Sequence, residues 1–217
     1  MRKTMLAASL LSTVIASASA QPNDISYQPK GLRPFIGVGL AAGGDTLLRV
    51  RTDVQGGPDY QSNIRAGDGL DLRVGLSMRL GDLPWSVQAV AAYHNDQTNG
   101  IEGSKYRFRR MPLEATLLWH ATDRARIGFG VRKSMQPKIK ITNGRSTDDA
   151  GNQITGINAS IDMKASTGFI VEGEYAVTPG WSLKGRYVYE TFRYKDFPDA
   201  DKEKGDHVAI QSVWYLN

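Results

Sequence analysis

The sequence contains no cysteine. A disulfide framework is therefore excluded, and the stability of the fold must come from backbone pairing and side-chain packing. The 27 basic and 22 acidic residues give a net charge of +5, which is too small to indicate a nucleic-acid-binding surface. After the N-terminal segment there is no run of about 18 apolar residues, so the sequence predicts no transmembrane helix.

The N-terminal segment, MRKTMLAASLLSTVIASASA, has the three parts of a secretory signal. Two basic residues come first, a short apolar stretch follows, and an A-x-A cleavage pattern ends at Ala20. The apolar stretch is too short to span a membrane. We therefore expect a signal peptide over 1–20 that is cleaved after Ala20. Residues 21–32 are polar and contain two prolines, which predicts a flexible lead-in to a single domain over 33–217.

A period of two dominates the rest of the chain. The segment LDLRVGLSMRL, residues 70–80, alternates apolar residues with charged or small ones, which is typical of a β-strand with two different faces. Short turns such as GDLP alternate with longer polar loops. A phase change near Arg109-Arg110-Met111 predicts a bulge in the fourth strand. In all, the pattern predicts eight strands, at roughly 33–52, 60–80, 84–97, 104–120, 124–141, 156–177, 180–194 and 206–217.

The tryptophans indicate which face of these strands meets lipid. All four fall at the short-turn ends of their strands, in phase with the apolar residues: Trp85, Trp119, Trp181 and Trp214. This placement predicts an aromatic girdle at one membrane interface. A second girdle is expected at the opposite end, from Tyr93, Tyr106, Tyr187 and Tyr189. The apolar face, including Leu72 and Val74, is then expected to face lipid, and Arg73 to face the lumen.

The polar face carries charges of both signs together with glycines, as a narrow interior filled by paired charges requires. An ordinary mixed-charge surface is the alternative. We expect at least one Arg–Glu network across the lumen, with Glu114, Glu172 or Glu174 among its acids. The predicted lumen charges are Asp71, Arg73, Arg79, Glu114, Arg126, Arg132, Lys164, Glu172, Glu174, Lys184, Arg186 and Glu190.

The signal, the eight strands, the short turns and the long loops resemble the small outer-membrane β-barrels of Gram-negative bacteria, of the OmpA-transmembrane-domain, OmpX and OmpW type. The segments GLAAGGDTLLRV and IRAGDGLDLRVGL are similar to a group of such barrels with no assigned activity. The last strand, HVAIQSVWYLN, has the alternation of a terminal barrel strand, although the family usually ends in an aromatic residue and this chain ends in Leu216-Asn217.

The resemblance implies an all-β fold, an eight-stranded antiparallel up-and-down transmembrane β-barrel in the outer membrane. It also implies contact with outer-membrane lipid and lipopolysaccharide, and with the barrel assembly machinery during biogenesis. We expect a monomer that does not bind nucleic acid.

The preferred function is a non-enzymatic barrel with a structural, surface-contact or narrow solute-path role, and two alternatives stay open. One is an enzyme that modifies acyl chains of lipid A or phospholipid, with His94 as base and Ser104 approaching it across a hairpin. The other is a soluble periplasmic barrel with an apolar ligand inside. No cofactor or metal is expected, because the loop acids lack the spacing of a calcium loop; these are Asp148, Asp149, Asp199, Asp201 and Glu203.

Overall fold

The computed structural model describes residues 27, 31–52, 60–100, 103–147, 153–197 and 199–216. The expected signal over 1–20, most of the expected lead-in, and the loop acids Asp148 and Asp149 lie outside these described residues. Within the described ranges, no helix is long and apolar enough to cross a membrane.

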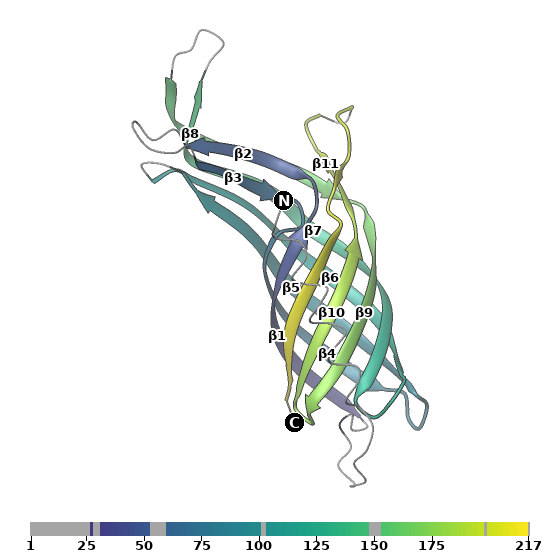
Figure 1. The fold of residues 1–217 in the computed structure, drawn as a ribbon. Helices are drawn as coiled ribbons and strands as arrows, with labels where there is room; N and C mark the ends of the chain where they lie inside the picture. The colour runs from purple at the N-terminus through teal and green to yellow at the C-terminus, as the bar shows by residue number, and fades with distance from the viewer. Residues whose placement is uncertain are drawn as a thin grey trace.

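Eight antiparallel strands close into a barrel (Figure 1). They are β1 (Leu32–Gly43), β4 (Gly69–Arg79), β5 (Trp85–Asn99), β6 (Lys105–His120), β7 (Ala125–Thr147), β9 (Thr167–Thr178), β10 (Trp181–Tyr189) and β13 (His207–Tyr215). Each pairs with the next in this order, and β13 pairs back with β1 to complete the ring. The predicted eight-stranded antiparallel barrel is confirmed.

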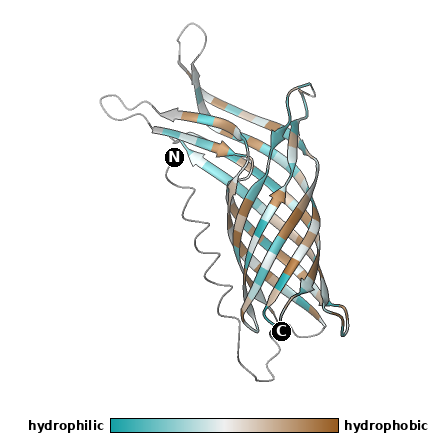
Figure 2. Ribbon diagram, turned by 45° about the vertical axis from the view of Figure 1, so that its right-hand side comes forward, coloured by the Kyte–Doolittle hydropathy of each residue, from teal (hydrophilic) through white to brown (hydrophobic). Residues whose placement is uncertain are grey.

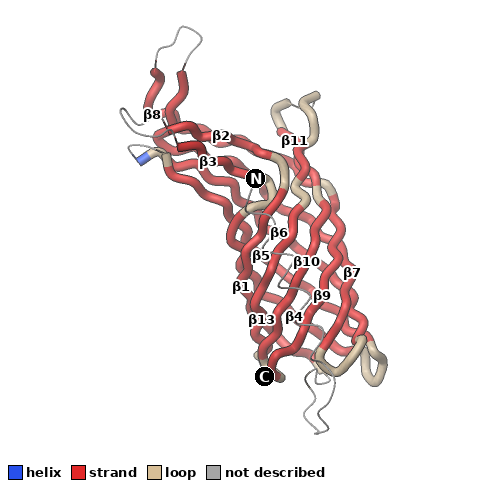
Figure 3. The backbone as a smooth tube through the Cα atoms, in the orientation of Figure 1, coloured by secondary structure: helices blue, strands red, loops and turns tan. Residues whose placement is uncertain are grey.

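The other five strands extend beyond the open, long-loop end of the barrel. They are β2 (Thr46–Thr52), β3 (Tyr60–Arg65), β8 (Gln153–Ala165), β11 (Thr191–Tyr194) and β12 (Glu203–Lys204). β2 and β3 form a hairpin, while β8 pairs with the upper part of β7 and β11 pairs with both β8 and β12. These strands, with the upper ends of β5, β6 and β7, form what we call the head, which leans away from the barrel axis (Figure 3).

Four of the predicted strands are therefore each divided into a barrel part and a head part. The first divides at Gly43 and Gly44, which both have positive φ angles (141° and 75°) that glycine adopts without steric cost. The second divides before Gly69, which also has a positive φ angle (130°). The sixth divides at Ser166, whose backbone N–H donates to the carbonyl of Thr191 over 2.8 Å, and the seventh divides at Glu190.

The two faces of the barrel wall have the predicted chemistry. Along β4, Leu72 and Val74 are exposed on the outside, whereas Asp71 and Arg73 are buried inside. Figure 2 shows the same alternation of hydrophobic and hydrophilic residues along the barrel strands. The alternative of a soluble barrel with an apolar lumen is wrong, because charged and polar side chains dominate the lumen and most large apolar side chains of the barrel are exposed on its outside.

The expected bulge lies on the neighbouring strand. β6 keeps one phase throughout, with alternate residues buried from Tyr106 to Leu118. The register between β6 and β7 shifts between Arg109 and Met111, and the extra residue is Gln136 of β7, which has a φ angle of 49°. Pro137 follows it and has no N–H to donate to a sheet, which is why proline is found at bulges.

The head has an apolar core. Its buried members are Val50, Ile64, Ala66, Tyr106, Phe108, Ile139, Met163, Ala165 and Phe192. The rings of Phe108 and Phe192 meet edge to face with centroids 5.5 Å apart, a favourable aromatic geometry. The interior of the chain thus changes from charged in the barrel to apolar in the head.

Candidate functional site

The lumen of the barrel holds nearly all of the charges predicted for it. Arg79 is half-buried at the turn end. The fully buried members of the predicted set are Asp71, Arg73, Glu114, Arg126, Arg132, Glu172, Glu174, Lys184, Arg186 and Glu190. The sequence pattern located them because large charged side chains alternate with lipid-facing apolar ones along each strand.

Lys164 is the exception, and the prediction for it was wrong. It lies on β8 with its side chain exposed on the outer face, while Met163 and Ala165 are buried. The break at Ser166 shifts the phase between β8 and β9, so the buried positions after it begin at Gly168. A period of two continued across this break places Lys164 on the wrong face.

Glu114 of β6 is the centre of the charge network. Its Oε2 lies 2.9 Å from Nη1 of Arg186 on β10 and 3.5 Å from Nη1 of Arg73 on β4. Its Oε1 lies 3.5 Å from Nη1 of Arg132 on β7. Three arginines from different sides of the ring therefore converge on one carboxylate. The predicted Arg–Glu network across the lumen is confirmed.

A second group of contacts lies nearer the turn end. Nζ of Lys184 lies 2.7 Å from Oε1 of Glu172 and 3.2 Å from Oε2 of Glu174. The same Nζ donates to Oε1 of Gln88 over 3.0 Å. Lys184 stands on β10 and Gln88 on β5, which lie four strands apart in a ring of eight. This hydrogen bond therefore runs directly across the barrel.

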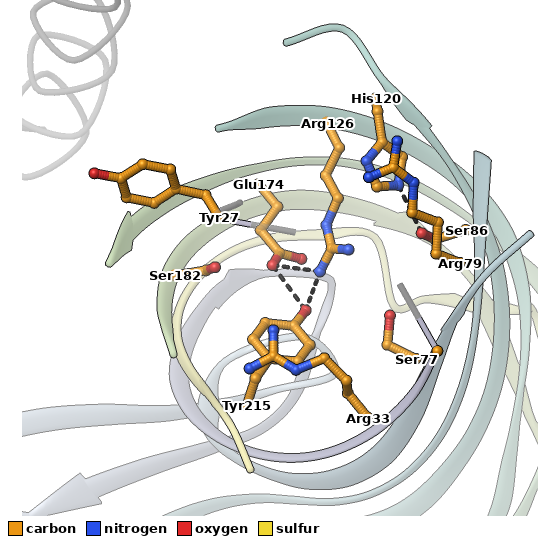
Figure 4. A pocket seen from close by; sticks show the side chains of 11 residues that line it. Tyr27, Arg33, Ser77, Arg79, Ser86, His120, Arg126, Glu174, Ser182 and Tyr215 are labelled. Atoms are coloured by element: carbon orange, nitrogen blue, oxygen red, sulfur yellow. Dashed lines mark hydrogen bonds and ion pairs between the residues drawn. The ribbon is translucent and has the colours of Figure 1, made fainter. Parts of the chain in front are cut away.

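Tyr215 closes the network toward the turn end. Its hydroxyl donates to Oε1 of Glu174 over 2.7 Å, and Nη2 of Arg126 donates to both of these groups (Figure 4). The amide of Gln88 donates to the same hydroxyl over 2.9 Å. Beside this cluster, Oγ of Ser86 and Nε2 of His120 are 2.6 Å apart.

The space left at this end is small. The cavity lined by Ser86, His120, Arg126 and Tyr215, among others, has a volume of about 20 Å³. A volume of this size holds about one water molecule. The Ser86–His120 pair therefore faces a space that no acyl chain fits.

Arg110 belongs to the network although it was not predicted. Its side chain is fully buried, and Nη1 lies 3.6 Å from Oε2 of Glu190 and donates to the carbonyl of Ala66 over 2.6 Å. Its guanidinium also lies 5.6 Å from the ring centroid of Phe108 and 5.1 Å from that of Phe192. Arg110 thus marks the boundary between the charged lumen and the apolar head. Its place on the unbroken inward phase of β6 was a usable signal, hidden by the bulge expected there.

The proposed catalytic pair is not formed. His94 is fully buried, its Nε2 lies 2.8 Å from the carbonyl oxygen of Asp68, and its Nδ1 lies 3.7 Å from Oδ2 of Asp71. Ser104 donates to the carbonyl of Asn143 over 2.7 Å. The register of β5 with β6 places Ser104 six residues beyond His94, about 20 Å along the strand.

The tryptophans pair across strands at the turn end. Trp85 lies opposite Trp119, and Trp181 lies opposite Trp214. Nε1 of Trp181 donates to Oγ of Ser212 over 2.6 Å. At the other end Tyr93, Tyr187 and Tyr189 are exposed as expected. Tyr106 differs, because it is buried in the core of the head.

The remaining loop acids that the structure describes are Asp199, Asp201 and Glu203, of which the first two are exposed and the third is half-buried. In the described part of the chain, no group of three or more histidine, cysteine, aspartate or glutamate residues is placed to hold a metal ion.

Comparison with known proteins found no matching family model and no matching curated protein. Solved structures do match. The attachment invasion locus protein Ail of Yersinia pestis, crystallised with the heparin analogue sucrose octasulfate, has 14% identity over 86% of this chain and 99% of its own, with a TM-score of 0.48. Neisserial surface protein A has 12% identity over 86% and 96%, also with a TM-score of 0.48.

The outer membrane protein OprG of Pseudomonas aeruginosa has 14% identity over 89% of this chain and 100% of its own, with a TM-score of 0.40. The closed eight-stranded barrel of this chain is established by its own strand pairing.

Proposed function

We propose that this chain is an outer-membrane protein of a Gram-negative bacterium, whose closed barrel carries the head as a surface for contact outside the cell. The height of the apolar exterior supports this. From Trp119 to Arg109, β6 runs ten residues, or about 33 Å along the strand and about 25 Å along the axis at a tilt near 40°. This matches the apolar band of outer-membrane barrels, about 25 Å tall.

The observation that carries the proposal is the charge network across the lumen. Glu114 binds arginines of three other strands, and Lys184 reaches Gln88 on the opposite wall. An eight-stranded barrel has an interior just wide enough for side chains, and here paired side chains occupy it. A barrel with its interior filled in this way is suited to anchoring a surface domain and not to passing solutes.

The enzymatic alternative receives less support from the geometry. His94 and Ser104 bind other groups about 20 Å apart along the strand. The serine–histidine pair that does form, Ser86 with His120, faces a cavity of about 20 Å³. The proposal is therefore of a non-enzymatic protein.

The proposal also includes the route to the membrane. The signal-like segment up to Ala20 directs export and is removed, and the barrel assembly machinery then inserts the chain as a monomer. The alternation of exposed and buried residues along β13 fits this step.

Three measurements test the proposal together. Purified protein refolded in detergent is expected to show a heat-modifiable shift on gels and to produce no large, stable conductance in planar bilayers. Lipid A from cells with and without the protein is expected to have the same acylation by mass spectrometry. A protein that is folded and monodisperse in buffer without detergent would overturn the membrane assignment, and a large conductance would overturn the closed lumen.

A further inference from the structure

A band of positive charge covers the outer face of the wall where the barrel meets the head. We call it the basic wall. Its members come from β6, β7, β8 and β11: Arg107, Arg109, Lys138, Lys140, Lys164 and Arg193. These strands pair side by side, and their registers place the six residues on one face. Arg109, Lys140, Lys164 and Arg193 are exposed, and Arg107 and Lys138 are half-buried.

The strand registers place like charges directly opposite each other. Arg107 is paired with Lys140, and Arg109 with Lys138, at successive outward-facing positions of β6 and β7. Like charges at opposed positions destabilise a sheet. Side chains opposite each other are about 5 Å apart, and successive residues on one face are about 7 Å apart. Four cations therefore lie within a patch of about 5 by 7 Å.

The same arrangement recurs on the neighbouring strands, where Arg193 is opposite Lys164. Among the described residues, the carboxylate of Asp162 pairs with lysines of this face. It lies 3.0 Å from Nζ of Lys138 and 3.8 Å from Nζ of Lys195. Arg107 binds an uncharged acceptor, Oε1 of Gln97, over 2.6 Å. Protein groups therefore leave a net positive charge on this face.

The basic wall begins where the apolar exterior ends. On β6, the exposed residues Met111, Leu113 and Leu117 lie between Arg109 and the tryptophan end. Arg109 stands about 25 Å above Trp119 along the barrel axis, which is the outer edge of the hydrocarbon layer in the membrane orientation proposed above. Short turns face the periplasm in such barrels, so this edge belongs to the outer leaflet.

The lean of the head turns the β6 part of this face toward the membrane. The β2–β3 hairpin lies on the upper side of the leaning head, and β5 and β6 lie on its lower side (Figure 1). The apolar core lies between the hairpin and these strands, so the outward face of β6, which carries Arg107 and Arg109, looks back toward the lipid surface.

We infer that the basic wall binds the phosphate groups of lipid A, the anionic amphiphile of the outer leaflet. The inference rests on the proposed membrane orientation. Cations opposed at about 5 Å complement a phosphate, because ionised donors and acceptors form the stronger hydrogen bonds, and an anion between them removes the like-charge repulsion. The acyl chains of the same molecule lie against the apolar exterior directly below.

The test uses the full mature chain in an uncharged maltoside detergent, with hexa-acylated diphosphoryl lipid A as probe and native mass spectrometry as readout. Two double variants remove cations from the wall: Arg109→Gln with Lys138→Gln, and Lys164→Gln with Arg193→Gln. A matched control, Arg49→Gln with Arg65→Gln, removes two exposed arginines from the β2–β3 hairpin. Each variant is first checked for the heat-modifiable gel shift, so that only folded barrels are compared.

Each wall variant is expected to bind lipid A roughly 25-fold more weakly, since each basic residue near an anionic surface contributes about fivefold. The control is expected to stay within about twofold, and binding by the wild type is expected to weaken as salt rises. Lipid A without its phosphates is expected to bind weakly to every protein.

Three results would overturn the inference: equal losses in the wall and control variants, equal binding of the phosphate-free lipid, or equal binding of phosphatidylglycerol, which would indicate a generic anionic-lipid face. Competition by millimolar inorganic phosphate would also count against it, because it would assign the site to free phosphate. Failure here is distinguishable from failure of the proposed function, which is measured by detergent dependence and conductance.

Discussion

Nζ of Lys184 lies 3.0 Å from Oε1 of Gln88, although the two residues stand on opposite walls of the barrel. The lumen at this level is therefore spanned by one hydrogen bond and is no wider than two side chains. The acids beside it, Glu172 and Glu174, bind the same ammonium group. These contacts determine whether the lumen is closed or lets solutes pass.

Replacing Lys184 by alanine is expected to open a narrow path. The change removes the side chain that crosses the lumen and leaves Glu172 and Glu174 with less positive charge nearby. We expect small single-channel currents that favour cations, because rings of acidic side chains select cations. Planar-bilayer recording checks this, with Lys202→Ala in an exposed loop as the control. A Lys184→Ala barrel as silent as the wild type would show that other side chains seal the lumen.

Replacing Glu114 by glutamine is expected to destabilise the barrel strongly. The carboxylate is buried and holds Arg73, Arg132 and Arg186, so the change leaves buried positive charge without its partner. Removing one member of a buried ion network costs about 3–5 kcal/mol. The urea midpoint in detergent measures this loss of stability. The control is Asp201→Asn, which changes an exposed acid in a loop. Equal midpoints for wild type and Glu114→Gln would mean that water screens the network.

Gly75→Ala is expected to destabilise the barrel because a Cβ there has no room. It would lie 2.5 Å from Cζ of Phe35 and 2.6 Å from the carbonyl oxygen of Ala89. Overpacking of this kind costs about 1–3 kcal/mol. Gly173→Ala is the matched control, since a Cβ at that position meets nothing within 4 Å. Stability is measured as the urea midpoint in detergent, and equal midpoints for the two variants would contradict the prediction.

Phe192→Ala is expected to loosen the head and leave the barrel closed. Phe192 is fully buried in the apolar core of the head, and truncating a buried phenylalanine costs about 3–5 kcal/mol. We expect faster trypsin cleavage in the head with an unchanged heat-modifiable shift. Phe197, which is 66% exposed, supplies the control variant Phe197→Ala. Loss of the gel shift in Phe192→Ala would show instead that head and barrel fold as one unit.

The alternation of residues along β4 predicts its two faces correctly, because a period of two depends on local geometry alone. The same reasoning fails at Lys164, where a break in pairing shifts the phase and nothing in the neighbouring residue types marks it. It also fails at Arg110, where the extra residue of the bulge, Gln136, lies on the next strand. Which charges meet across the lumen depends on strand register and barrel closure, and these are properties of the whole ring.

The contacts across the lumen have a consequence for the order of assembly. Gln88 binds Tyr215, a residue 127 positions later, and Gln211 lies 3.5 Å from Asp71, 140 positions earlier. Such contacts form only once β13 has paired with β1, because an unclosed sheet holds these walls apart. Pairs between neighbouring strands, such as Arg126 with Glu174, can form before closure. Pairs between distant strands, such as Arg186 with Glu114, lack their partners until then, and unpartnered charges in an apolar setting are costly. The step that closes the ring therefore completes the part of the network that crosses the lumen.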